Sequence, residues 1–177
     1  MDIKLVVPDE NYKEQVMGYR KEFFDNNEYD LHGCAGLEEC ETYEEWIDFE
    51  NRLYEKYKEN YVPSTIYLGV RESDNKVVGI IDLKHKFTDF LFKYGGNIGY
   101  SVRPTERRKG YAKQMLKLMI EECKKYDFEK VLISCDKVNL GSSKTILANG
   151  GILENEVEDE VGLTKSGIIQ RYWINIK

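Results

Sequence analysis

The chain has 177 residues, of which 41% are hydrophobic, and a formal net charge of −6. This length is typical of one domain with a full-sized core, so we expect a single domain over residues 1–177. The acidic balance argues against nucleic acid as a partner, because nucleic-acid-binding domains usually present a basic face. No apolar run approaches a membrane span, and the N-terminus lacks the apolar core of a signal peptide. We therefore expect a cytoplasmic protein with no membrane partner.

Four cysteines and two histidines form no recognisable metal pattern. No Cys-x-x-Cys pair is present, although His32 lies close to Cys34 and Cys40 in the sequence. Structural zinc sites usually draw on four ligands at closer spacing. We therefore expect no metal, and thiols that stay reduced, as is usual in the cytoplasm.

The first third of the chain predicts one short strand and two amphipathic helices. An apolar run over residues 3–7 stops at Pro8, which favours an edge strand. Asp9 can cap a helix that reaches about residue 24. A capping-box pattern, Thr42 followed by Glu45, predicts a second helix over 43–61. The expected apolar faces of the two helices are Tyr12, Val16, Tyr19 and Phe23, and Trp46, Phe49, Leu53 and Tyr57.

The rest of the chain predicts strands interrupted by helices. Strand-like patterns cover residues 65–71, 76–83, 98–102, 130–135, 151–157 and 168–176, and helical patterns cover 110–126 and 139–149. The segment 86–94 mixes aromatic and charged residues and is left unassigned. This order of elements predicts an α/β (α+β) domain with a mixed, mainly antiparallel central sheet and helices on both faces.

Residues 103–112, Arg-Pro-Thr-Glu-Arg-Arg-Lys-Gly-Tyr-Ala, are the most informative segment of the chain. Four cations and one glutamate give it a net charge of +3. It lies between a predicted strand and a predicted helix, whose first amides have no intrahelical acceptor and whose dipole adds positive charge. Gly110 lets the backbone approach a ligand closely. The segment therefore predicts a site for a phosphate-bearing cofactor.

Two motifs narrow down that cofactor. Arg107-x-x-Gly110-x-Ala112 fits the pattern Arg/Gln-x-x-Gly-x-Gly/Ala, and about 30 residues later Asn-Leu-Gly-Ser-Ser-Lys-Thr-Ile-Leu-Ala-Asn-Gly-Gly covers 139–151. The glycine patterns of a P-loop and of a dinucleotide fold are absent. In these motifs, over residues 97–152, and in its order of elements, the chain resembles the GNAT superfamily of acetyl-coenzyme A-dependent N-acetyltransferases.

The resemblance implies that acetyl-coenzyme A (acetyl-CoA) is the co-substrate and that three segments bind it. The turn 107–112 would wrap the pyrophosphate, the strand 98–102 would pair with the pantetheine arm, and residues 139–144 would lie along pantetheine and the adenosine phosphate. The strands 98–102 and 130–135 would splay apart around the thioester. The implied cofactor-binding residues are Tyr100, Ser101, Val102, Arg107, Arg108, Lys109, Gly110, Tyr111, Ala112, Asn139, Ser142 and Lys144.

The acid and base that many members of this family use are missing from their usual positions. The strand 98–102 contains no glutamate. Alignment on Gly150 places Ile146 where many relatives have a tyrosine acid.

Other residues are therefore candidates for catalysis. His85 is the candidate base, because histidine exchanges protons near neutral pH. Asp82 is a candidate for binding a cationic acceptor, and Tyr172 for reaching the cleft from the last strand. Each also has a structural interpretation, as a surface histidine, an exposed carboxylate and a core tyrosine. Cys135 as a nucleophile is disfavoured, because buried thiols are usually inert.

The predicted acceptor is an amine. Residues 9–60 carry 16 acidic and 6 basic side chains, a net charge of −10, and the last predicted hairpin is acidic as well. Such a field would attract a cationic acceptor, for example a polyamine, an aminoglycoside or a lysine-containing peptide. The same charges are also explained as solvated helix faces.

The predicted function is transfer of an acetyl group from acetyl-CoA to a primary amine by direct attack. The absence of the usual acid and base supports an alternative, a non-catalytic acyl-CoA-binding sensor or regulatory protein. A third hypothesis is an interaction module that works through the segment 86–94. We leave open whether the chain forms a homodimer.

Overall fold

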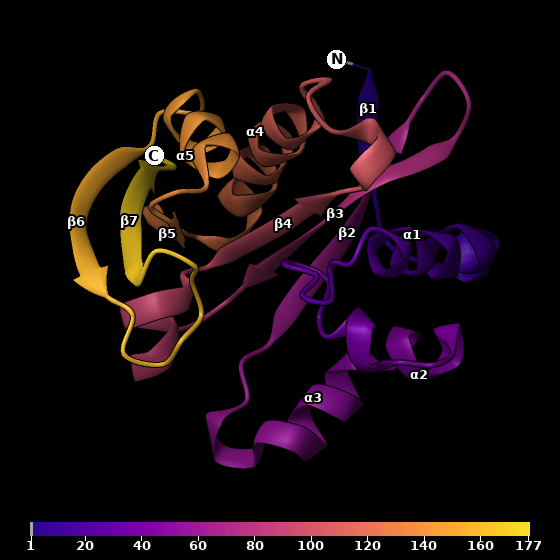
Figure 1. The fold of residues 1–177 in the computed structure, drawn as a ribbon, viewed down its shortest axis with the longest axis horizontal. Helices are drawn as coiled ribbons and strands as arrows, with labels where there is room; N and C mark the ends of the chain where they lie inside the picture. Colours follow the sequence, from indigo (N-terminus) through magenta and orange to yellow (C-terminus); the bar gives the residue numbers. More distant parts are fainter. Residues whose placement is uncertain (1) are drawn as a thin grey trace.

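The computed structural model describes residues 2–177 and contains two antiparallel sheets with helices around them (Figure 1). The strands are β1 (Ile3–Val6), β2 (Ser64–Arg71), β3 (Lys76–Lys84), β4 (Ile98–Val102), β5 (Lys130–Asp136), β6 (Ile152–Glu158) and β7 (Ile168–Asn175). The α-helices are α1 (Lys13–Asp25), α2 (Tyr43–Ile47), α3 (Phe49–Tyr57), α4 (Tyr111–Cys123) and α5 (Leu140–Leu147). The strand orders are β1-β2-β3-β4 and β5-β7-β6. The predicted fold class is confirmed.

Helices cover both faces of the four-stranded sheet. In Figure 1, α4 lies on one side of this sheet, and α1 and α2 lie on the other. The side chains of β3 explain this arrangement: Ile80 packs into the cluster that contains the apolar face of α1, whereas Ile81 and Leu83 pack into the cluster around α4. Because β3 is buried on both faces, its sequence is a nearly continuous apolar run.

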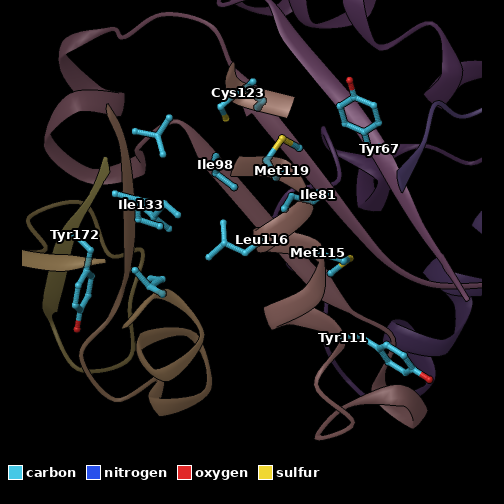
Figure 2. Packing of buried hydrophobic residues seen from close by; sticks show 14 of the residues in the cluster. Tyr67, Ile81, Ile98, Tyr111, Met115, Leu116, Met119, Cys123, Ile133 and Tyr172 are labelled. Atoms are coloured by element: carbon cyan, nitrogen blue, oxygen red, sulfur yellow. The ribbon is translucent and has the colours of Figure 1, made fainter. Parts of the chain in front are cut away.

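The larger core holds the two sheets together through α4. Figure 2 shows Leu116 and Met119 of α4 beside Ile81 and Ile98 of the first sheet, with Ile133 of the second sheet on the far side. Glycine permits the close contact between helix and sheet, because a Cβ atom at either Gly69 or Gly79 would lie 2.5 Å from an atom of the Met115 side chain. The position of α4 at Met115 is therefore fixed against β2 and β3.

The adjoining strands β4 and β5 meet only where they begin. The backbone N–H of Asn97 donates to the Leu132 carbonyl (2.7 Å), and the Leu132 N–H donates to Asn97 Oδ1 (2.9 Å). Beyond this point the two strands separate, since β4 is an edge strand of one sheet and β5 is an edge strand of the other. All strand pairs within residues 2–177 are antiparallel. The expected splay is therefore present, and it divides the predicted central sheet into two sheets.

Two helices differ from their predicted form. The expected helix over 43–61 begins at its capping box but breaks at Asp48 into α2 and α3. Trp46 of α2 is tied to the preceding loop, because its indole N–H donates to the Cys34 carbonyl (2.8 Å), whereas α3 has no fully buried residue. The predicted helix over 110–126 is α-helical only to Cys123 and continues to Tyr126 as a 3-10 turn, where Tyr126 is 41% exposed.

The unassigned segment 86–94 contributes to a short π-helical turn, Leu91–Gly95, which lies beside Ser134 of β5. Within residues 2–177, no helix combines the length and apolar character that crossing a membrane requires. The described residues also contain no group of three His, Cys, Asp or Glu side chains placed to hold a metal ion.

Candidate active site

A cleft of about 880 Å³ lies between β4 and β5 and extends over the first turns of α4 and α5. Its lining contains 11 of the 12 residues predicted to bind the cofactor, and Lys109 is the one that it lacks. The remaining lining includes side chains from the loop after α1, from the segment 84–95 and from the loop between β6 and β7. The cleft therefore extends beyond the predicted cofactor site to a second group of residues.

The turn before α4 presents backbone amides to this cleft. Arg108 (φ +61°) and Gly110 (φ +85°) adopt left-handed conformations, a geometry that turns successive N–H groups toward one point. Among the described residues, no hydrogen bond uses the N–H groups of residues 108–113, and the first amide of α4 with an acceptor is that of Gln114. A Cβ atom at Gly110 would meet nothing within 4 Å. This arrangement fits phosphate oxygens.

The cations of the same turn are mostly paired within the protein. The pairs are Arg103–Glu22 (3.5 Å), Arg107–Glu28 (2.7 Å at each of two nitrogen–oxygen contacts) and Lys109–Glu106 (2.8 Å). Arg108 has no carboxylate partner within residues 2–177. Lys113 and Lys144 also line the cleft. Of the three cations predicted to bind the phosphates, Arg107 and Lys109 thus have carboxylate partners, whereas Arg108 has none among the described residues.

Glu106 fixes the base of the turn as a buried carboxylate. It is 4% exposed and accepts hydrogen bonds from Lys109 (2.8 Å), Lys76 (2.6 Å) and Arg71 (2.8 Å). Burial opposes ionisation of this carboxyl, but the hydrogen bonds from Lys109, Lys76 and Arg71 outweigh it and lower its pKa to about 2.

This cluster predicts a pH dependence of folding. Because the pKa of Glu106 is lowered from 4.5 to about 2, its contribution is complete above pH ~4.5 and is lost as the pH falls toward ~2, an effect of about 3 kcal/mol. We expect Glu106→Gln to lower the free energy of unfolding by about 3 kcal/mol at neutral pH and to remove this dependence. Denaturant titrations at several pH values test this. Glu121→Gln, which breaks an exposed pair with Lys124, is the control, and an equal effect of both variants would contradict the prediction.

The β4 wall of the cleft is held from both sides. Tyr100 Oη lies 2.9 Å from Ser142 Oγ on α5, and burial raises the pKa of Tyr100 far above its usual value. On the opposite face, Ser101 Oγ contacts the Tyr19 hydroxyl (2.9 Å) and Cys34 Sγ (3.2 Å). The α5 helix begins at Asn139, whose Oδ1 accepts the Ser142 N–H (3.1 Å).

None of the three predicted catalytic side chains lines the cleft. His85 Nε2 contacts Thr65 Oγ1 (2.7 Å), its ring packs 4.7 Å from that of Tyr126, and burial lowers its pKa. Tyr172 is 3% exposed and donates its hydroxyl proton to Gln170. The catalytic roles of both stay predictions that these positions do not favour.

Asp82 is also occupied, although it lies beside the cleft. It is 4% exposed, pairs with Lys84 (2.7 Å) and accepts the Gly99 N–H (2.9 Å). This position favours support of β4 over contact with an acceptor. Cys135 does line the cleft, but burial raises the pKa of its thiol to about 11 and thus keeps it protonated.

The other histidine does line the cleft. His32 and Asp30 lie in the loop after α1, with His32 Nε2 3.6 Å from Asp30 Oδ2. The loop rests directly on β4, since a Cβ atom at Gly33 would lie 2.3 Å from the Gly99 carbonyl oxygen. In the sequence, His32 stands out only as a possible metal ligand near Cys34 and Cys40. Gly33 was the signal of this close contact, but its partner strand was not visible in the sequence.

Comparison with known proteins identifies the family. Residues 27–146 match the model of the Acetyltransferase (GNAT) family. The chain belongs to the GNAT family of acetyltransferases. It is therefore an acyltransferase, and the family resemblance inferred from the two motifs is confirmed. A comparison with curated proteins found no match.

Solved structures share this GNAT fold at low sequence identity. A ribosomal-protein-S5-alanine acetyltransferase from Vibrio fischeri has a TM-score of 0.70 and 16% identity, over 100% of this chain and 94% of that chain. A microcin C7 self-immunity acetyltransferase in complex with acetyl-CoA and AMP has a TM-score of 0.67 and 19% identity, over 98% and 92%. A spermidine N-acetyltransferase chimera from Vibrio cholerae has a TM-score of 0.65 and 11% identity, over 99% and 96%. The TM-scores show that the fold is shared, whereas identities this low leave the acceptor of this chain open.

Proposed function

We propose that this GNAT protein transfers the acetyl group of acetyl-CoA to a primary amine by direct attack. The observation that carries the proposal is the run of amides over 108–113, without protein acceptors and opening onto the gap between β4 and β5. Bound acetyl-CoA would supply an activated thioester. Arg108 and the amides of the turn would hold its pyrophosphate, and the unpaired edge of β4 would offer backbone hydrogen bonds to its amide-containing arm.

His32 is the base that fits this reaction. Of the two histidines in the chain, it is the one in the cleft lining. Asp30 lies 3.6 Å from Nε2 and would orient the ring, which leaves Nδ1 to accept a proton from the amine. On the other side of the cleft, Tyr100 holds a proton at Oη beside Ser142. Ile146, at the position of the family's usual acid, is fully buried and has no proton to give.

The acceptor is proposed only as an amine. Much of the acidic surface that favoured a cation is internally paired, including Glu39 with Lys56, Glu156 with Lys137 and Glu160 with Lys93. Asp30 is the acidic side chain that lines the cleft and is also exposed. The names of similar structures include an alanine of ribosomal protein S5 and spermidine, a polyamine, so both protein and polyamine amines belong in a screen.

Two measurements test the proposed function. Calorimetric titration with acetyl-CoA is expected to show micromolar binding, and a screen of polyamines and peptide N-termini is expected to reveal amine-dependent release of the free thiol. The second measurement separates an enzyme from an acyl-CoA sensor. A folded sample that binds no acetyl-CoA would overturn the cofactor site, and binding with no turnover of any amine would overturn the transfer reaction.

A further inference from the structure

The side chain of Arg107 contacts residues outside its own turn. Its two terminal nitrogens each donate to a different Glu28 oxygen at 2.7 Å. Its Nε donates to the Val102 carbonyl (3.0 Å), and its guanidinium lies 5.2 Å from the centre of the Phe23 ring. All three guanidinium nitrogens thus have protein acceptors. A bidentate pair of this kind fixes orientation as well as distance.

The partner of Arg107 begins the loop that carries His32. Five residues further along, the same loop is fixed a second time, because Gly33 rests on the Gly99 backbone and Cys34 Sγ lies 3.2 Å from Ser101 Oγ. Residues 29–32 therefore form a short span between two attachments to the cofactor-binding half of the protein. Both Asp30 and His32 lie in this span and in the cleft lining.

A second carboxylate attaches α1 to the same turn. Glu22 accepts hydrogen bonds from the Thr105 N–H (2.8 Å) and hydroxyl (2.7 Å) and lies 3.5 Å from Arg103. Hydrogen bonds from Arg107 also lower the pKa of Glu28, which keeps the Arg107–Glu28 pair ionised at neutral pH. The end of α1 and the following loop are thus held on the turn at two acidic residues.

We propose that Arg107 and Glu28 are positioning residues for the acceptor site, and that Arg107 does not bind the cofactor phosphates. Their ion pair holds residues 29–32 so that His32 faces the acceptor end of the cleft. The inference rests on the proposed function in one respect, the assignment of His32 as the base. It assigns different tasks to two adjacent arginines, with Arg108 serving the cofactor and Arg107 the acceptor.

The test compares Arg107→Gln with Arg108→Gln. Glutamine is the other residue that the motif pattern admits at position 107, so the turn is expected to form in that variant. We expect Arg107→Gln to raise the acceptor KM about tenfold and to change the acetyl-CoA dissociation constant less than about threefold. We expect Arg108→Gln to weaken acetyl-CoA about tenfold and to leave the acceptor KM nearly unchanged.

Variants of the partner separate positioning from general loss of structure. Glu28→Gln keeps the shape of the side chain and is expected to reproduce the acceptor defect of Arg107→Gln, while the double variant adds little to either. Arg107→Lys is expected to raise the acceptor KM less than Arg107→Gln does, because one ionic contact with Glu28 survives. Hydrogen exchange of residues 28–34 is expected to increase in Glu28→Gln and not in Glu121→Gln.

The outcomes distinguish this inference from the proposed function. If Arg107→Gln weakens acetyl-CoA as much as Arg108→Gln does and spares the acceptor KM, Arg107 is a phosphate ligand and the inference is wrong. Unchanged hydrogen exchange of the loop in Glu28→Gln would also overturn it. If hydrogen exchange of residues 28–34 increases in Glu28→Gln but His32→Gln retains full turnover, the ion pair does hold the loop and the assignment of His32 as the base is wrong.

Discussion

Replacing Gly110 by aspartate is expected to weaken acetyl-CoA binding by about 100-fold or more. The residue lies at φ +85°, at the start of α4, among amides that have no acceptor within residues 2–177. An added carboxylate would occupy the position proposed for the phosphate oxygens and would repel them, because both groups are negatively charged. Because a Cβ atom at this position meets no protein atom within 4 Å, the fold should survive the change.

Gly110→Asn is the matched control for this experiment. Asparagine and aspartate have nearly the same shape, and both tolerate the left-handed conformation better than other side chains. The difference between the two variants in calorimetric titrations therefore reports charge at the site. We expect the asparagine variant to lose at most about tenfold in affinity. Equal affinities of both variants would show that phosphate does not bind at this turn.

Replacing His32 by glutamine is expected to lower kcat by about 100-fold or more, because an amine that keeps its proton cannot attack. We expect acetyl-CoA binding to be unchanged, since His32 lies in the loop after α1 and not in the turn before α4 that we propose holds the phosphates. In the parent protein kcat/KM is expected to fall at low pH, because a protonated imidazole cannot accept a proton. In His32→Gln this fall at low pH is expected to disappear. Steady-state kinetics over a range of pH values measures both effects.

His85→Gln is the control for His32→Gln, because these two residues are the only histidines in the chain. His85 contacts Thr65 and packs against Tyr126, outside the cleft lining. We expect its replacement to leave kcat and the pH profile within about twofold of the parent. If His85→Gln removes the acidic limb instead, the original assignment of His85 as the base is correct and His32 is not the base.

Most of the fold could be predicted from the sequence because its signals are local. The apolar runs of β2 and β3, the capping box at Thr42 and the spacing of Val16, Tyr19 and Phe23 each depend on residues within a few positions of one another. The break at Asp48 could not be predicted in this way. It accompanies the contact of Trp46 with the Cys34 carbonyl, which depends on the path of the preceding loop.

The phosphate turn is likewise a local feature, so the sequence by itself determined it. A strand, Gly110 and a helix start lie within a few residues of one another, which was enough to predict the free amides, whereas the family followed from both motifs and the order of elements. The second motif adds Asn139, whose capping of α5 is also local.

Only the tertiary structure decided what the charged side chains around this turn do. Arg107 and Glu28 are 79 residues apart in the sequence, and His32 meets the cleft only because Gly33 rests on β4. A net charge counts Arg107 as a free cation, whereas the folded chain pairs it with a distant carboxylate. Backbone geometry follows from neighbouring residues, but ion pairs and the choice between two histidines follow from the path of the whole chain.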